Sequence, residues 1–303
     1  MPATALRTVD DFRPVIQKIE QSVGQVLKYD QWLASHEIVT PGAPNDSARW
    51  KTFDLGDAML AEPDYADTDW GTIELPQRWE NSEIGSFDGI VWLRKEVRIP
   101  EDWMQQELTL SLGPIDDMDA TYVNGTKVGG YEREGLWEKD RIFTVPADLV
   151  DTRTLTLAVR VIDLGGGGGI YGEPEDLRLE PKRLDRKGVS LAGSWKYLPI
   201  AEYAAGEFYR FGIENQEYYT HPKVGIDVGS STPTFLYNGM IAPVAPYTIR
   251  GAIWYQGESN TDRPEQYKTL FPTMIDSWRN KWDQDAFPFY YVQIAPWEYG
   301  DDT

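Results

Sequence analysis

Ala120-Thr-Tyr-Val-Asn-Gly125 is the stretch on which the fold assignment depends, because it joins a short β-prone run to a tight turn. Asn-Gly at the centre of a two-residue turn favours the type I′ geometry, in which both residues take positive φ and the flanking strands pair. The stretch therefore predicts an antiparallel hairpin around Asn124 and Gly125.

Further β-rich runs lie on both sides of this hairpin and are separated by Gly, Pro, Asp and Asn. They are Val91 to Ile99, Leu108 to Leu112, Thr154 to Val161 and Leu177 to Leu179. Short strands at this spacing predict an antiparallel β-sandwich. The five glycines Gly165 to Gly169 lack the Lys and Ser/Thr of a phosphate loop, so they indicate a structural loop.

The two ends of the chain have a different pattern. Apolar residues from Asp10 to Val23 recur at helical spacing, and Pro41 ends the helical region. Near the other end, a buried strand at Ile249 to Trp254, a helix beginning near Asp262 and a strand at Phe287 to Ile294 predict a parallel βαβ unit. We therefore expect an α/β domain formed by residues 1–48 and 197–303, interrupted by a β-sandwich at 49–196.

Composition excludes several classes of function. The 303 residues carry a formal net charge of −20, which disfavours nucleic acid and anionic membrane surfaces as partners. There is no Cys, and no run reaches the roughly 18 apolar residues of a spanning helix. The 12 Trp and 17 Tyr are rings that fill sandwich cores and, where exposed, stack on sugars.

The most specific motif is Gly251-Ala-Ile-Trp-Tyr-Gln-Gly-Glu-Ser-Asn260, which runs from a predicted strand into the following loop. It resembles the third conserved block of SGNH esterases, in the form found in sialate O-acetylesterases and related acetyl xylan esterases. The resemblance extends to three other segments: Pro233 to Pro243, Tyr267 to Arg279 and Phe287 to Ala295. It implies a flavodoxin-like SGNH hydrolase domain with a parallel sheet.

The resemblance also implies roles for individual residues. Gln256 would donate its side-chain amide to an oxyanion hole, where charge develops on the attacked carbonyl oxygen. Gly239 would offer a second, backbone N–H, and Glu258 would hold the loop or orient a catalytic His. Asn238 and Trp254 are the candidate substrate-binding residues. No metal or cofactor is expected.

The middle of the chain carries a second resemblance. The segments Gly89 to Val97, Leu112 to Gly125 and Ala158 to Asp163 are similar to the galactose-binding-like sandwich of β-galactosidase-type glycosidases. Sialate O-acetylesterases carry such a sandwich inserted in their hydrolase domain. Asp116, Asp117 and Asp119 are also candidates for a metal or acid/base site, but in that fold such residues more often fix turns between strands, which is the expectation here.

Family members use a Ser nucleophile in a Gly-rich block and an Asp/His pair near the C-terminus. We expect neither block in this chain, so the nucleophile and the base are predicted to lie outside it. Ser259 lacks the second glycine of a nucleophile elbow. His36 and His221, the two histidines, are expected to be ordinary polar residues, and their spacing does not fit zinc.

The sequence thus predicts a carbohydrate O-acetylesterase, similar to sialate 9-O-acetylesterase, that uses a Ser-His mechanism and is inactive as this chain alone. The alternative is a carbohydrate-binding module in which Trp70, Trp79 and Trp137 line one groove on a non-catalytic α/β platform. The expected partner is an acetylated carbohydrate. The sugar and the oligomeric state are left open, and a periplasmic or secreted location would require a signal peptide.

Overall fold

A computed structural model describes residues 1–43, 48–182, 188–214, 217–222, 231–284 and 286–295. The chain divides into two compact units. One contains Met1–Tyr29 together with Lys223–Thr303, and the other contains Asp30–Pro222.

The larger unit is built on an antiparallel sheet that has eight strands among the described residues, in the order β1-β13-β12-β3-β8-β5-β6, with β2 also paired to β12. Its strands are β1 (Glu37–Val39), β2 (Gly71–Leu75), β3 (Gly89–Arg98), β5 (Met118–Val123), β6 (Thr126–Gly129), β8 (Thr154–Asp163), β12 (Gly193–Ala204) and β13 (Glu207–Arg210). The predicted hairpin is confirmed: Val123 pairs with Thr126, and Asn124 and Gly125 have φ of 48° and 78°.

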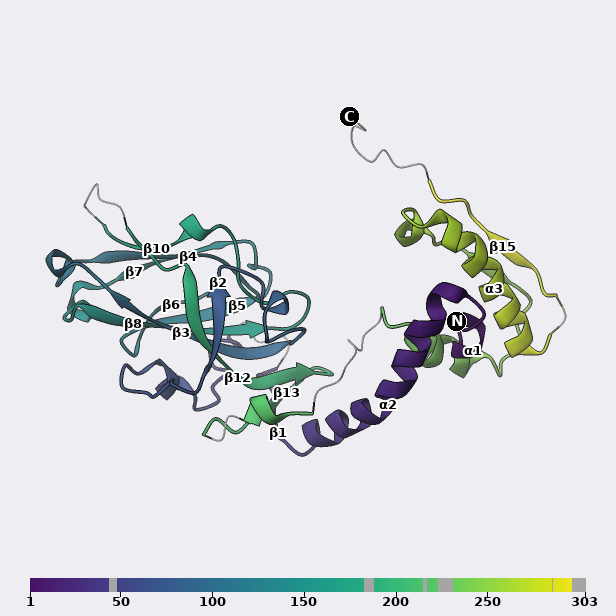
Figure 1. The fold of residues 1–303 in the computed structure, drawn as a ribbon, viewed down its shortest axis with the longest axis horizontal. Coiled ribbons are helices and arrows are strands. Elements are labelled where there is room, and N and C mark those ends of the chain that lie inside the picture. The colour runs from purple at the N-terminus through teal and green to yellow at the C-terminus, as the bar shows by residue number, and fades with distance from the viewer. Residues whose placement is uncertain (44–47, 183–187, 215–216, 223–230, 285, 296–303) are drawn as a thin grey trace. The chain divides into compact units, whose positions relative to one another are not determined.

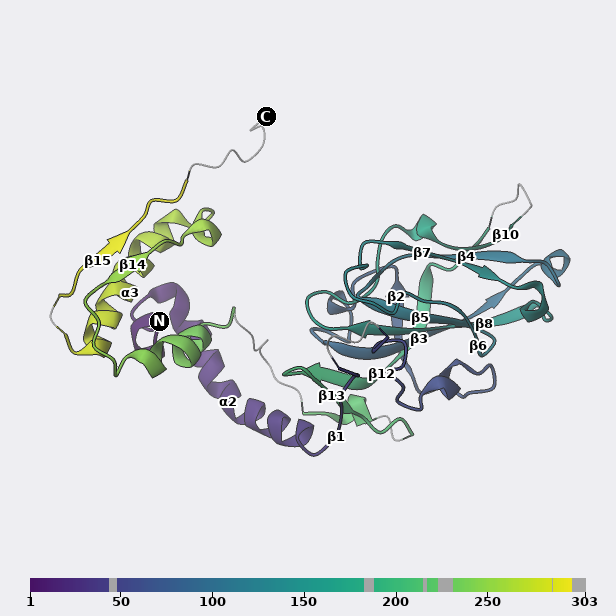
Figure 2. The same cartoon turned by 180° about the vertical axis from the view of Figure 1, so that it is seen from behind.

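A second antiparallel sheet has five strands among the described residues and forms another layer over the first (Figures 1 and 2). Its strands are β4 (Leu108–Asp116), β7 (Asp140–Val145), β9 (Gly169–Ile170), β10 (Leu177–Pro181) and β11 (Val189–Ser190). The predicted hairpin and the four other β-rich runs lie in strands of these two sheets, apart from Ile99, which directly follows β3. The larger unit is therefore a β-sandwich.

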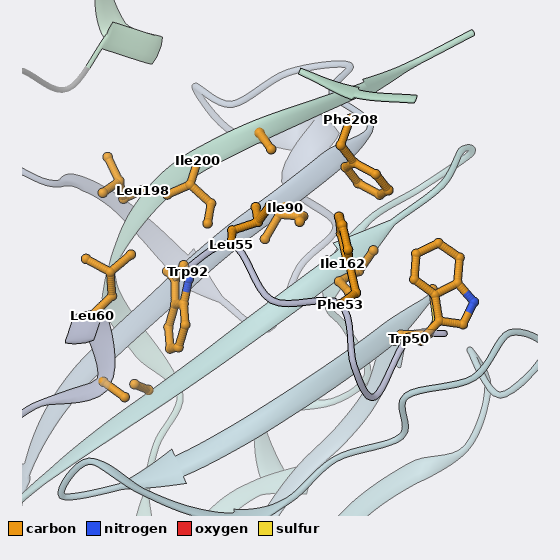
Figure 3. Close-up of a cluster of buried hydrophobic side chains, with 14 of the residues drawn as sticks. Trp50, Phe53, Leu55, Leu60, Ile90, Trp92, Ile162, Leu198, Ile200 and Phe208 are labelled. Carbon is orange, nitrogen blue, oxygen red and sulfur yellow. The ribbon is translucent and has the colours of Figure 1, made fainter. Parts of the chain in front are cut away.

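Strand β3 is buried on both faces from Gly89 to Arg94, where the run Ile90 to Leu93 is apolar. Ile90 and Trp92 point to a cluster that includes Phe53 and Leu60 from the segment before β2 (Figure 3). Val91 lies on the opposite face, because side chains alternate along a strand, and it too is fully buried. The eight-stranded sheet is thus covered by the second sheet on one face and by residues 50–70 on the other.

A buried ion pair and its hydrogen bonds hold residues 50–70 against the sheet. The Asp57 carboxylate accepts hydrogen bonds from Arg160 Nε at 2.7 Å and from Trp92 Nε1 at 2.8 Å. Both partners belong to the sheet, and all three side chains are buried. A buried ion pair is held in place by such additional hydrogen bonds, so Asp57 links the covering segment to two strands.

The smaller unit contains the helices α1 (Ala3–Leu6) and α3 (Pro264–Trp282) and most of α2 (Arg13–Leu33). The amphipathic helix expected from Asp10 onward is confirmed by α2. Two short strands, β14 (Ala252–Trp254) and β15 (Phe289–Tyr291), pair in parallel, and α3 connects them. The local strand, helix, strand order expected here is present.

The predicted fold class is nevertheless wrong. An α/β fold with a flavodoxin-like parallel sheet needs several parallel strands, whereas β14 with β15 is the single parallel pair in the described ranges. Sheet content is instead dominated by antiparallel strands. The prediction failed because one βαβ unit has the same sequence pattern whether or not further strands join it.

The units differ in extent from the predicted domains. Strand β12 crosses the predicted boundary at residues 196 and 197, and β1 and β13 pair on the side expected to be α/β. The domain boundaries 1–48, 49–196 and 197–303 therefore stay a prediction. In the described part of the chain, no helix combines the length and the apolar character required to cross a bilayer.

Replacing Asp57 with Ala is expected to destabilise the sandwich by about 3–5 kcal/mol, because Arg160 would keep a buried charge without its partner. The measurement is urea unfolding. The matched control is Glu101→Ala, which breaks an exposed pair with Arg153 and should cost under about 1 kcal/mol. Equal losses in the two variants would contradict the linking role of Asp57.

Candidate functional site

The loop that follows β14 carries Gln256 at the carboxyl end of a parallel strand. In α/β units, ligands bind at this end of the strands. Val292 N donates to Trp254 O at 2.9 Å, so the carboxyl ends of β14 and β15 lie side by side. A side chain at Gly251 would meet Pro288 O at 2.8 Å, so the close approach of the two strands requires glycine there.

Two donors hold the backbone carbonyl of Gln256. Trp254 Nε1 donates to it at 3.0 Å and Tyr267 Oη at 3.2 Å. The Trp254 ring lies 6.2 Å from that of Phe271 and 6.1 Å from that of Trp278, both on α3. The carbonyl is therefore fixed to the strand and to the helix, and Trp254 acts first as a packing residue. Its predicted contact with substrate stays a prediction.

The side chain of Gln256 is exposed, in contrast to its fixed backbone. Its amide makes no hydrogen bond to any residue that the structure describes. The contacts to Trp254 and Tyr267 fix the backbone of Gln256 and leave its amide N–H available to donate to an oxygen on which charge develops. The geometry is compatible with the predicted role of Gln256.

Glu258 bonds to its own loop. Its Oε2 accepts a hydrogen bond from Gly257 N at 2.9 Å. This contact fits the loop-holding role better than the alternative role of orienting a histidine. Ser259 is exposed, and its carbonyl accepts a bond from Arg263 Nη2 at 2.9 Å. Nothing in the described contacts joins the Ser259 hydroxyl to a histidine.

Asn238 and Gly239 lie in a single π-helical turn, Tyr237–Ile241. Tyr237 is buried and anchors the turn, while Asn238 and Gly239 are exposed. No hydrogen bond between described residues joins either of them to Gln256. The pairing of Gly239 with Gln256 as two oxyanion donors therefore stays a prediction.

The two histidines gather around Trp32 in the sandwich unit. The rings of His36 and His221 have their centroids 4.3 Å and 5.7 Å from that of Trp32. His36 Nδ1 donates to Trp32 O at 2.7 Å, and its Nε2 lies 3.2 Å from Glu217 Oε1. Both histidines thus have structural contacts in the sandwich, whereas Ser259 belongs to the other unit.

A hollow of about 360 Å³ lies within the smaller unit, away from the predicted site residues. It is lined by Thr8, Val9, Asp10, Asp11, Glu265, Gln266 and Thr269. A hydrogen bond of 2.9 Å from Gln266 Nε2 to Asp11 Oδ2 joins its two walls. Since none of the predicted residues faces it, this hollow does not extend the Gln256 site.

The three aspartates noted in the sandwich have separate roles. Asp119 is fully buried and pairs with Arg141 at 2.8 Å, and Asp117 accepts a bond from Leu164 N at 3.0 Å. Burial, together with the charge of Asp117, raises the pKa of Asp116 to about 7. No group of three or more His, Cys, Asp or Glu side chains in the described ranges could hold a metal ion.

Asp163, at the end of β8, is fully buried, and no cation among the described residues forms an ion pair with it. Its Oδ1 accepts a bond from Gly165 N at 2.9 Å, while its Oδ2 has no partner within the described structure. Burial, with the charges of Asp88, Asp117 and Asp116, raises its pKa to about 8. A Cβ on Gly168 would lie 2.4 Å from Asp163 Oδ2, so the glycine run closes over this carboxyl.

The Asp163→Asn variant is expected to become increasingly more stable than the unchanged protein as pH rises from about 4 to about 8. The folded pKa of about 8 lies above the ordinary value of 3.8, so between these values the unfolded chain releases a proton that the folded chain retains. Stability is therefore lost as pH rises, by at most about 1.4 kcal/mol per pH unit for one group. Asn keeps the acceptor for Gly165 and removes the titration.

The measurement is thermal unfolding of both proteins across this pH range. Asp148→Asn is the control, because Asp148 is exposed in the same unit and the substitution removes the same charge. An Asp163→Asn variant whose stability varies with pH as steeply as that of the unchanged protein would contradict the burial argument.

Sequence reasoning missed two features of these sites. The first is Tyr267, whose hydroxyl fixes the Gln256 carbonyl; its position in the first turns of α3 was the available signal. The second is Asp163, which directly follows the apolar run of β8 and precedes the glycines. A carboxylate between a buried strand and five glycines indicates that it lies inside the protein.

Residues 226–302 match a protein family described as carbohydrate esterase, sialic acid-specific acetylesterase, and all the predicted site residues lie within them. Sialate O-acetylesterases from Pongo abelii and Homo sapiens are each 32% identical over 114 residues. That match covers 35% of this chain and 21% of each relative, so the chain spans a minor part of their length. The predicted resemblance is confirmed.

Solved structures match the chain more weakly. A glycosyl hydrolase family 2 member from Bacteroides cellulosilyticus DSM 14838 covers 50% of this chain and 19% of its own, at 18% identity and a TM-score of 0.33. A β-glucuronidase from an uncultured Clostridium sp. covers 55% and 30%, at 15% identity and a TM-score of 0.31. Similarity at this level carries no conclusion about function.

Proposed function

We propose that residues 226–302, which belong to the family of sialic acid-specific carbohydrate acetylesterases, form the oxyanion side of a site that hydrolyses acetyl esters on sugars. The observation that carries the proposal is the state of Gln256. Its exposed side-chain amide has no partner among the described residues, and Trp254 and Tyr267 hold its backbone carbonyl. Family and geometry support the same residue.

The chemistry requires such a donor. Attack on an acetyl ester converts the carbonyl oxygen into an oxyanion, and a fixed N–H stabilises that charge more than it stabilises the neutral ester. One such donor typically contributes about 2.7–4 kcal/mol to lowering the barrier. In this proposal Gln256 donates one N–H, Gly239 a second, and Asn238 contacts the sugar.

The remaining steps follow the Ser-His scheme, in which Ser attacks the carbonyl and His takes its proton. We assign neither role to Ser259, His36 or His221, because both histidines pack around Trp32 in the sandwich unit. The 303-residue chain alone is then expected to turn over acetyl esters little or not at all. The acetylated sugar, sialate or another, is left open by this site.

The alternative of a carbohydrate-binding groove lined by Trp70, Trp79 and Trp137 is wrong in that form. Trp70 and Trp79 are 4% and 0% exposed. Trp79 donates its indole N–H to Phe87 O at 3.0 Å inside the sandwich. Rings that are buried in this way cannot stack on a sugar, so only Trp137, 40% exposed, remains available.

Gln256→Ala is expected to lower the kcat for p-nitrophenyl acetate by about 10²–10³-fold with little change in KM, because the lost N–H acts mainly in the transition state. The measurement uses the natural protein that contains these residues. Gln21→Ala, an exposed glutamine on α2, is the control and should leave kcat unchanged.

Wild-type turnover by Gln256→Ala would overturn the oxyanion role, and failure of the natural protein to hydrolyse any acetyl ester would overturn the esterase assignment. Tyr267→Phe tests the support of the loop. It removes one of the two bonds to the Gln256 carbonyl and should lower kcat by a smaller factor than Gln256→Ala.

A further inference from the structure

Carboxyl groups hold the backbone of the glycine loop, residues 164–169, which directly follows β8. Three of its backbone N–H groups donate to side-chain carboxyls that come from three separate segments of the chain. The bonds are Leu164 N to Asp117 Oδ2 at 3.0 Å, Gly165 N to Asp163 Oδ1 at 2.9 Å and Gly168 N to Glu80 Oε1 at 3.1 Å. The closed form of the loop therefore depends on these three side chains.

The glycine loop lies directly on the buried carboxyl of Asp163. A Cβ on Gly168 would meet Asp163 Oδ2 at 2.4 Å and the Trp79 ring at 2.1 Å. A Cβ on Gly167 would meet Arg78 Nη1 at 2.8 Å. Asp163 is 0% exposed in this closed form. The two glycines thus let the loop approach closely enough to keep water away from the carboxyl.

Two carboxyl oxygens under the loop have no hydrogen-bond partner among the described residues. They are Glu80 Oε2 and Asp163 Oδ2, and both are inaccessible to water. A buried oxygen that carries negative charge and accepts no hydrogen bond is strongly disfavoured, whereas a protonated carboxyl has no charge to solvate. Closing the loop over Asp163 therefore favours the protonated form of that side chain.

Neighbouring carboxyl groups add to the effect of burial. The groups that act on Asp163 are Asp88, Asp116 and Asp117, and those near Asp116 are Asp117, Glu80, Tyr171 and, with the opposite sign, Arg78. Burial, together with these charges, raises the pKa of Asp163 to about 8 and that of Asp116 to about 7. The single guanidinium offsets the carboxyl groups only in part, so the closed loop retains protons near neutral pH.

Paired strands fix both ends of the glycine loop. At one end Asp163 pairs with Gly89 of β3, and at the other Gly169 pairs with Asp116 of β4. Between these ends lie one leucine and four glycines, and glycine gains more backbone freedom than other residues when it is released. The loop can therefore open by itself while the strands on either side stay paired.

Opening of the loop depends on pH in a defined direction. Once the loop opens, water solvates Asp163 and Asp116, whose ordinary pKa is 3.8, and both ionise. The closed form thus retains protons that the open form releases between about pH 4 and about pH 8. Opening is therefore increasingly favoured as pH rises, by up to about tenfold per pH unit for each proton released.

We propose that the glycine loop is a proton-dependent latch, which stays closed while Asp163 and Asp116 hold their protons and opens as they lose them. The sandwich stays folded when the latch opens. Opening uncovers a group of carboxyls, so this part of the surface gains a negative charge that depends on pH. The latch is independent of Gln256, and it does not rest on the proposed esterase activity.

The test measures amide hydrogen exchange of the 303-residue chain by NMR across this pH range, with the intrinsic exchange rate at each pH divided out. Gly165 and Gly168 report on the latch. Thr156 reports on unfolding of the sandwich, because it lies within β8 and its N–H donates to the uncharged Oδ1 of Asn124 at 2.9 Å. We expect both glycines to be less protected than Thr156 at every pH, and their protection to fall by up to about tenfold per pH unit for each proton released.

Asp163→Asn keeps the acceptor for Gly165 and removes one titrating group, so the fall in protection with pH should become shallower. Adding Asp116→Asn should abolish it. Asp148→Asn removes an exposed carboxylate of the same unit and should keep the fall of the unchanged chain. The unfolding temperature checks that each variant is folded. Equal protection of Gly165 and Thr156 in the unchanged chain, or an equally steep fall in folded Asp163→Asn, would each overturn the latch.

Discussion

The central strands of the eight-stranded sheet are buried on both faces, and this places charged side chains where water does not solvate them. Arg94 on β3 shows how the charge is accommodated. It is 2% exposed, and it donates to Leu60 O at 2.5 Å, Glu62 O at 3.0 Å and the Asp67 carboxylate at 2.9 Å. A buried guanidinium is tolerated when its N–H donors are hydrogen-bonded. The segment that covers the sheet must therefore place its carbonyl and carboxylate oxygens at these positions next to Arg94.

The same solution recurs on β7. Arg141 pairs with Asp119 and donates to the carbonyls that flank Trp137. In both places a strand supplies the cation, and the segment above it supplies backbone carbonyl oxygens. The backbone of that segment is therefore hydrogen-bonded directly to the sheet below it. Asp163 is the contrasting case, because no described cation pairs with it and burial raises its pKa to about 8, which favours the protonated form. The sandwich therefore contains carboxyl groups paired with a cation and also a carboxyl group whose pKa is raised by burial.

Much of this architecture could be predicted from local patterns. Asn124-Gly125 set a hairpin because the turn geometry depends on those two residues alone. The strands around Trp92 and Val159 were predictable from continuous apolar runs. What could not be predicted was the other end of β12, which continues the antiparallel sheet past residue 197. Strand pairing depends on distant partners, and a single run of residues does not specify them.

Among the site residues, too, some could be predicted from the sequence and others could not. Gln256 was predicted from its motif, and its oxyanion role stays a prediction, with the residue exposed in the structure. The residues that hold it could not be found from the motif, because Tyr267 lies 11 residues further along and reaches Gln256 only when α3 packs on β14. Asp57 escaped notice for the same reason, since its partners lie 35 and 103 residues away.

In the smaller unit, the loop that carries Gln256 follows a sheet of only two short strands among the described residues. Strands β14 and β15 pair over three residues, and Ile253 and Tyr290, which face each other in register, are 81% and 67% exposed. Parallel strands are ordinarily buried on both faces, so this pair gains little rigidity from its own surroundings. The aromatic contacts of Trp254 with α3 supply that rigidity instead. The position of Gln256 therefore depends more on the helix than on the sheet, and a change in the α3 face that contacts Trp254 would move the donor without touching it.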